Sequence, residues 1–196
     1  FKVAVGTELF EENYSYALYE TDMGTKANKI NANKDIRRYG NVFSYLNYTV
    51  NPKLILEAGI NVNLLDYSVL DGFEGDGQDV TKSYTYEAIV SPRLGINYSH
   101  NEFLSFYASV GHGFSHPSLE ETLLPEGQVN TSIKPEQGYN FEFGSRVSLL
   151  NGKLYADVTF YKIYLSNLLL TKRETEAVFY GINAGKTEHQ GLEFLL

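Results

Sequence analysis

The chain has 196 residues, with 24 acidic and 16 basic side chains, a formal net charge of −8 and no cysteine. This charge argues against a general nucleic-acid binder, which needs a basic face. No run of about 18 consecutive apolar residues is present, which excludes a transmembrane helix but leaves transmembrane strands open, because alternating strands score low on hydropathy. The sequence begins and ends inside strand-like patterns, so we expect a fragment of a longer protein.

Eight segments alternate apolar and polar residues with a period of two, and they are predicted to be strands. They cover approximately residues 2–10, 39–50, 54–67, 84–99, 104–114, 140–149, 153–168 and 186–196. In the fourth segment, Pro92 usually marks an edge strand or a bulge. These strands have about 9–16 residues, which is longer than the 5–6 residues common in soluble sheets.

The connections between these strands alternate between short and long. The short ones are 51–53, 100–102 and 150–153, where Asn151-Gly152 predicts a two-residue hairpin turn. The long ones are predicted to be loops over residues 11–38, 68–83, 115–137 and 167–183. Short turns on one side and long loops on the other are typical of outer-membrane barrels.

The two faces of the predicted strands differ in composition. Leu104, Phe106, Ala108 and Val110 are predicted to share an outer face with Phe141, Phe143 and Val147. The opposite face is rich in Asn, Ser, Gly, Tyr and Thr, whereas a soluble sandwich would expose mainly charged residues. Its isolated charges are predicted to face a lumen and to pair with one another or with a plug: Glu57, Arg93, Glu142, Arg146 and Glu193. A secreted β-sandwich with the same alternation is the alternative.

Aromatic residues near the strand ends could form membrane-interface girdles. Tyr48 and Tyr98 lie beside short turns, whereas Tyr67, Tyr84 and Phe114 lie near the long loops. Ordinary cross-strand aromatic pairing would explain the same residues equally well.

Four motifs follow one another in the second half of the chain. They are Tyr107-Ala108-Ser109-Val110-Gly111-His112-Gly113-Phe114 with Pro117-Ser118-Leu119; Lys134-Pro135-Glu136 with Asn140, Glu142 and Gly144; Leu150-Asn151-Gly152-Lys153-Leu154; and Asn183-Ala184-Gly185 with Gly191 and Glu193. In this order, residues 103–196 resemble the later barrel strands of TonB-dependent outer-membrane receptors. Residues 2–99 match that family by their alternation only.

The resemblance implies an all-β, antiparallel, up-and-down transmembrane β-barrel. Residues 1–196 would all belong to the barrel domain, as an open segment of about eight strands, strands nine to sixteen of 22. The plug domain and the TonB box would lie upstream of it. The implied location is the outer membrane of a Gram-negative bacterium, where the protein crosses the membrane many times. The implied partners are outer-membrane lipid, an iron–siderophore complex and, through the N-terminal region, the TonB complex.

No catalytic motif is found, so we expect neither an enzyme nor a cofactor. His112 and His116 are four residues apart. In an extended chain such a pair spans roughly 13 Å, which is too far to chelate one ion, so no metal site is predicted.

The ligand class is inferred from the loop over residues 115–134. Haem receptors of the family carry a FRAP box, an NPNL box and a histidine between them. Here the boxes read Phe114-Ser115-His116-Pro117 and Asn130-Thr131-Ser132-Ile133, and residues 119–129 contain no histidine. A ferric siderophore is therefore expected, with candidate contacts at Arg37, Arg38, Tyr84, His116 and Gln128.

Several alternatives remain open at this point. One is a receptor of the same family for haem, cobalamin or another scarce nutrient, in which His116 would replace the missing haem ligand. Another is a non-transporting outer-membrane β-barrel, such as a porin or an adhesin. The third is a soluble extracellular β-rich binding module.

Overall fold

The structure is a computed structural model that describes residues 1–73, 75, 77, 79–122, 130–173 and 179–196. These residues form the helix α1 (Leu119–Thr122) and strands β1 (Lys2–Asp22), β2 (Thr25–Asn51), β3 (Leu54–Asp71), β4 (Lys82–Thr85), β5 (Ile89–Ser99), β6 (Leu104–Ser115), β7 (Glu136–Leu149), β8 (Leu154–Ser166), β9 (Leu169–Arg173), β10 (Phe179–Asn183) and β11 (Lys186–Leu195). Within the described ranges, no helix has the length and apolar character needed to span a membrane.

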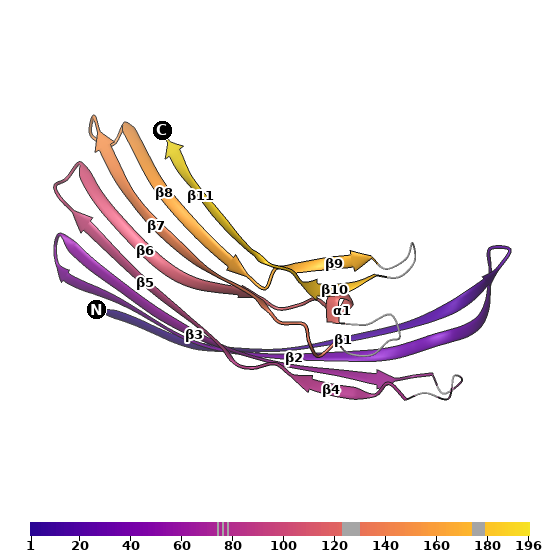
Figure 1. Ribbon diagram of the computed structural model, residues 1–196. Coiled ribbons are helices and arrows are strands. Elements are labelled where there is room, and N and C mark those ends of the chain that lie inside the picture. The colour runs from indigo at the N-terminus through magenta and orange to yellow at the C-terminus, as the bar shows by residue number, and fades with distance from the viewer. Residues whose placement is uncertain (74, 76, 78, 123–129, 174–178) are drawn as a thin grey trace.

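Eight antiparallel strands form one curved wall (Figure 1). Their order is β1-β2-β3-β5-β6-β7-β8-β11, while β4 pairs with β3 and β9 pairs with β10 in a separate hairpin. The strands of the wall follow one another in chain order, with β4 inserted after β3 and the β9–β10 hairpin after β8, and β1 and β11 are the two edges of the wall among the described strands. The prediction of about eight strands in an open up-and-down arrangement is therefore confirmed.

The first long connection is a hairpin and not the loop predicted over residues 11–38. Strands β1 and β2 continue through this segment, and their pairing runs from Lys2–Asn47 to Asp22–Thr25. The turn between them is made by Met23 and Gly24, with φ values of 46° and 82°. Two consecutive positive φ values characterise the type I′ turn, which suits the twist of a hairpin. Backbone pairing does not require a regular alternation of side chains, so a hairpin that mixes polar and apolar residues on both faces resembles a loop in the sequence.

Other predicted boundaries also need correction. The predicted strand over residues 84–99 is divided into β4 and β5, and Pro92 lies within β5. The β5–β6 ladder ends at Arg93–Gly111, directly beside Pro92, which has no N–H to donate. The turn at Asn151-Gly152 has four residues, because the ladder closes at Leu149–Leu154. The predicted loops over residues 115–137 and 167–183 contain α1 and the β9–β10 hairpin.

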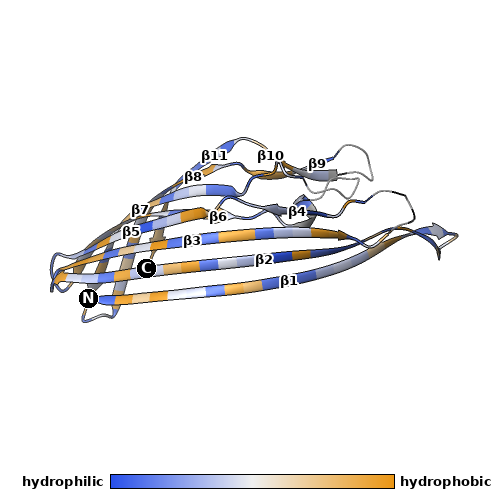
Figure 2. Ribbon diagram, turned by 90° about the horizontal axis from the view of Figure 1, so that it is seen from below, coloured by the Kyte–Doolittle hydropathy of each residue, from blue (hydrophilic) through white to orange (hydrophobic). Residues whose placement is uncertain are grey.

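The strand register separates two faces of the wall. We call the side with Leu94, Val110 and Phe141, which lie opposite one another on β5, β6 and β7, the apolar face. Ile96, Ala108 and Phe143 form the next row on that face, and Phe143 is 58% exposed. Leu104 pairs with Val147 and Phe106 with Ser145, so the prediction that these residues share one face with Phe141 and Phe143 is confirmed. Figure 2 shows the resulting alternation of hydrophobic and hydrophilic residues along the strands.

The opposite side of the wall is the polar face. Glu57, Arg93, Glu142, Arg146 and Glu193 all lie on it, as predicted. Arg146 forms its ion pair with Asp157 on the neighbouring strand, at 2.9 Å, and not with another member of this set. The phenolic hydroxyl of Tyr107 also donates to Asp157, and the Arg146 guanidinium lies 4.1 Å from the centre of the Tyr107 ring.

Buried apolar side chains collect where the long connections cover the wall. Tyr67 and Val69 of β3 are 1% and 0% exposed, and the partly buried Val80 and Tyr84 pack against them. The possibility that Tyr67 belongs to a lipid-facing girdle is therefore wrong, because its ring lies in this core. Tyr48 and Tyr98 do lie on the apolar face near the short turns.

Candidate functional site

The candidate site lies at the long-loop end of the polar face, around His116. This residue directly follows β6, and its ring centre is 5.0 Å from that of Phe114, 6.0 Å from that of Tyr86 and 6.1 Å from that of Tyr39. The side chain is half-buried, and neither ring nitrogen has a hydrogen-bond partner among the described residues. Burial, reinforced by the charge of Arg37, lowers the pKa of His116 to about 4. The imidazole is therefore neutral near pH 7.

Arg37 and Arg38 lie on opposite faces of β2, although they are adjacent in the sequence. The Arg37 guanidinium forms an ion pair of 2.7 Å with Glu12 on the polar face. The Arg38 side chain lies on the other face, 2.9 Å from Glu11 and 3.8 Å from Asp66. Since side chains alternate along a strand, only Arg37 of these two predicted contacts is near His116.

Asp35 is the buried acid of this region. It lies two residues before Arg37 on the same face of β2 and is 1% exposed, and neither carboxylate oxygen has a donor among the described residues. Its neighbour Asn33 donates to the Tyr16 hydroxyl at 3.1 Å, while the Asn33 Oδ1 also has no donor there. Burial raises the pKa of the Asp35 carboxyl to about 6. The site thus contains buried hydrogen-bond acceptors without donors among the described residues, next to aromatic rings.

Tyr84 supports the site from β4. Its ring meets that of Tyr86 edge-on, with the centres 4.9 Å apart, and it packs on Tyr67 and Val69. Gln128, the remaining predicted contact, lies outside the described residues. The structure therefore gathers Arg37, Tyr84 and His116 into one region and places Arg38 elsewhere.

Sequence reasoning missed Asp35 and Tyr86 as members of the site. The predicted loop over residues 11–38 includes Asp35, although Asn33, Asp35 and Arg37 alternate in the sequence. Extending the strand through this segment would have placed all three on one face. No comparable signal exists for Tyr86. It lies between β4 and β5, outside a regular strand, so its position beside His116 depends on the course of that connection.

Two long connections are joined beside the site. Asn130 donates from Nδ2 to the carbonyl of Gly181 in β10, at 3.1 Å, and Ile133 is 2% exposed. Asn183, at the end of β10, holds the backbone of Lys134 by two hydrogen bonds. Within the described part of the chain, no group of three His, Cys, Asp or Glu residues is placed to hold a metal ion.

Comparison with known proteins identifies the family. A sequence model described as "TonB dependent receptor-like, beta-barrel" matches residues 3–196. The chain belongs to this family of TonB-dependent receptors. A curated relative, the ferric-pyoverdine M114 receptor PbuA of Pseudomonas sp. (strain M114), is 25% identical over 164 residues, which are 81% of this chain and 19% of that protein.

Solved receptors share the fold of this barrel segment. The copper transporter OprC superposes with a TM-score of 0.77 at 15% identity, covering 98% of this chain and 31% of its own. The ferric-catecholate import receptor Fiu from E. coli K12 gives 0.68 at 15% identity, covering 98% and 32%. The ferripyoverdine receptor of the Pseudomonas aeruginosa outer membrane gives 0.67 at 19% identity, covering 98% and 27%.

The chain thus spans about a fifth of its curated relative and about a third of these solved receptors. The predicted family, the barrel fold and the prediction that the chain is not an enzyme are confirmed, because this is a family of receptors and transporters. The family is one of outer-membrane β-barrels of Gram-negative bacteria.

Proposed function

We propose that this chain is a wall segment of an outer-membrane receptor that takes up a ferric siderophore with energy from the TonB complex. Family membership supports the receptor assignment, and the named ligand of the curated relative, a ferric pyoverdine, supports the siderophore. In this proposal the apolar face meets lipid, the polar face meets the lumen and its plug, and the long connections face the outside.

The lengths of the strands fit this placement. A transmembrane strand needs about 9–11 residues, which the segments of β2 and β3 nearest their shared short turn provide. On the apolar face, Glu11, Arg38 and Asp66 form the first charged row beyond Leu9, Gly40 and Leu64. Asp35 and His116 lie on the outer side of this row.

The observation that carries the ligand class is the cluster of His116, Tyr39 and Tyr86 beside Arg37 and Asp35. Iron–siderophore complexes present flat or ring-shaped organic surfaces edged by hydrogen-bonding groups. A site that combines aromatic walls with a few polar groups is suited to such a ligand. Arg37 brings a guanidinium group, paired with Glu12, to this cluster, and the oxygens of Asp35 and Asn33 are buried acceptors that have no donor among the described residues.

Haem is the second candidate, because His116 is neutral and its two nitrogens have no partner among the described residues. A neutral imidazole of this kind is able to ligate haem iron.

Growth of a deletion strain on single iron sources tests the proposal. The strain would carry the full-length gene on a plasmid and receive ferric pyoverdine, a ferric catecholate, ferric citrate or haem. We expect rescue on one siderophore, with uptake of radioactive iron that disappears when TonB is deleted. Rescue on haem alone would select the second candidate, and rescue on no iron source would contradict both.

A further inference from the structure

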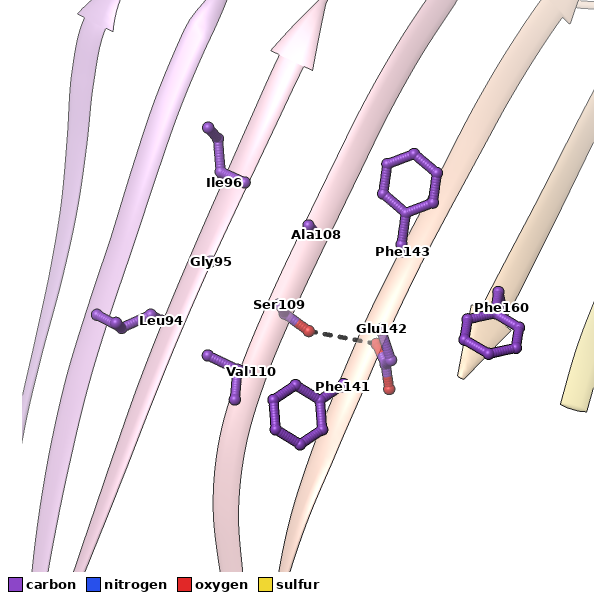
Figure 3. Close-up of a pocket in the computed structure, with 10 residues that line it drawn as sticks. All are labelled: Leu94, Gly95, Ile96, Ala108, Ser109, Val110, Phe141, Glu142, Phe143 and Phe160. Atoms are coloured by element: carbon purple, nitrogen blue, oxygen red, sulfur yellow. Dashed lines mark hydrogen bonds between the residues drawn. The ribbon is translucent and has the colours of Figure 1, made fainter. Parts of the chain in front are cut away.

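A hollow on the apolar face crosses β5, β6, β7 and β8 (Figure 3). Its volume is about 490 Å³. Its cause is the small side chain of Ala108, which lies between the larger Ile96 and Phe143 in one row across three strands. In the next row toward the long-loop end, Leu94 and Phe141 continue the two walls, and Val110 forms the floor between them. The result is an apolar trough along β6.

A second hollow, of about 520 Å³, lies further toward the long loops. On the apolar face, His112 is the next residue after Val110 along β6, and Tyr139 is the residue before Phe141 along β7. The two hollows are therefore adjacent along the same strands. The side chains that line the second hollow on the apolar face are mostly polar: His112, Gln137, Tyr139, Tyr164, Ser166 and Lys186. An apolar trough therefore ends in a polar pocket.

The charge of the polar pocket is set by Lys186. Glu188, which also lines the pocket, is neutralised by Lys162 at 2.7 Å. The Lys162 ammonium also lies 4.9 Å from the centre of the Tyr164 ring. Lys186 is exposed, and no ion pair is found for it among the described residues. One cation in excess, beside hydroxyl, amide and imidazole groups, matches an anionic group such as a phosphate.

We infer that the two hollows form one binding site for a single anionic lipid, with an acyl chain in the Ala108 trough and its phosphate headgroup at Lys186. This inference rests on the proposed placement of the apolar face in the membrane. The lipid site is separate from the siderophore site on the polar face. Tyr139 and Tyr164 lie between the two parts, at the level where amphipathic rings accompany lipid headgroups. A long lysine side chain at this level reaches the headgroup region while its stem lies along apolar surface.

The test is a lipid titration of the full-length receptor in dodecyl maltoside, followed by native mass spectrometry. The probes are dimyristoyl phosphatidylglycerol, which is anionic, dimyristoyl phosphatidylcholine, which is zwitterionic, and inorganic phosphate. We expect saturable binding of one phosphatidylglycerol that Lys186→Gln weakens about fivefold. Lys34→Gln is the matched control, because Lys34 lies on the same face of the wall at its long-loop end. It should change the affinity less than twofold.

Filling the trough tests its acyl-chain part. Ala108→Phe should weaken phosphatidylglycerol binding at least fivefold, and Ala108→Leu provides a smaller change if the phenylalanine variant does not fold. Unchanged binding in Lys186→Gln, or in a folded Ala108 variant, would overturn the inference, as would equal affinity for the two lipids. Displacement of the lipid by inorganic phosphate would indicate a free-anion site instead. A receptor dimer that the Ala108 variants abolish would indicate a protein contact and would also overturn it.

Siderophore binding by the same preparations separates the two proposals. A receptor that binds phosphatidylglycerol as expected but no siderophore would contradict only the proposed ligand. A receptor that binds its siderophore normally in Lys186→Gln, with no loss of lipid affinity, would contradict only the lipid site.

Discussion

The side-chain amide of Asn183 pairs with the backbone of Lys134 as a neighbouring strand would. Its Nδ2 donates to the Lys134 carbonyl at 2.8 Å, and its Oδ1 accepts from the Lys134 N–H at 2.7 Å. The same Nδ2 donates to the carbonyl of Asn167 at 2.8 Å. The two residues are 49 positions apart and begin two of the sequence motifs, so one side chain joins the two long connections next to the candidate site.

Asn183→Ala should uncouple these connections. It removes three hydrogen bonds to the backbone of Lys134 and Asn167, which we expect to cost about 1–3 kcal/mol locally. Hydrogen exchange of the full-length receptor should become faster at Lys134 and Gly181 while the wall strands remain protected. Asn97→Ala, on the polar face of β5, is the control and should leave both regions unchanged. Unaltered exchange at Lys134 in Asn183→Ala would refute the coupling.

Replacement of Asp35 by Asn should stabilise the receptor above pH 6. The folded pKa of about 6 is above the ordinary value of 3.8, so the folded state binds the proton more tightly than the unfolded state does. Stability therefore rises as the pH falls from about 6 to about 4, and ionisation above pH 6 costs about 3 kcal/mol. Urea midpoints at pH 5 and pH 7.5 measure this effect. Asp35→Asn should remove the contribution, and an unchanged pH profile would contradict it.

His116 should give a pH dependence of the opposite sign. Its folded pKa of about 4 is below the ordinary 6.5, so protonation favours the unfolded state and stability is lost as the pH falls from about 6.5 to about 4. The loss is about 3 kcal/mol at full protonation. His116→Phe keeps a ring among Phe114, Tyr39 and Tyr86 and should remove this acid-induced loss. The exposed His189→Phe is the control, and a persistent loss in His116→Phe would refute the assignment.

Gly144→Ala should destabilise the wall. A methyl group on Gly144 would overlap the ring of Tyr107, which lies directly opposite on β6. Displacing that ring would break its hydrogen bond to Asp157 and its contact with Arg146, and overpacking of this kind costs about 1–3 kcal/mol. Gly113→Ala, on the same strand pair, meets no atom within 4 Å and should cost much less. Equal urea midpoints for the two variants would disprove the effect.

The alternation of side chains carried the strongest information in the sequence. It predicted that Phe106 and Phe143 share one face and that Arg146 lies on the other, because a period of two is a property of each strand by itself. It also predicted the eight strands of the wall, and the three short turns predicted which of them pair as hairpins. The motif glycines Gly144 and Gly191 were recognised only as a pattern. Their physical reason is the aromatic ring opposite each one, Tyr107 and Tyr161.

The sequence by itself therefore determined the faces of the strands, the order of the wall and the family. Only the tertiary structure decided where β1 and β2 end, because residues 11–38 mix polar and apolar residues on both faces and backbone pairing leaves no mark in composition. It also decided that Arg37 and His116, 79 positions apart, are close enough for the charge of one to lower the pKa of the other. Such proximity depends on how the long connections fold back over the polar face, and no local periodicity encodes that path.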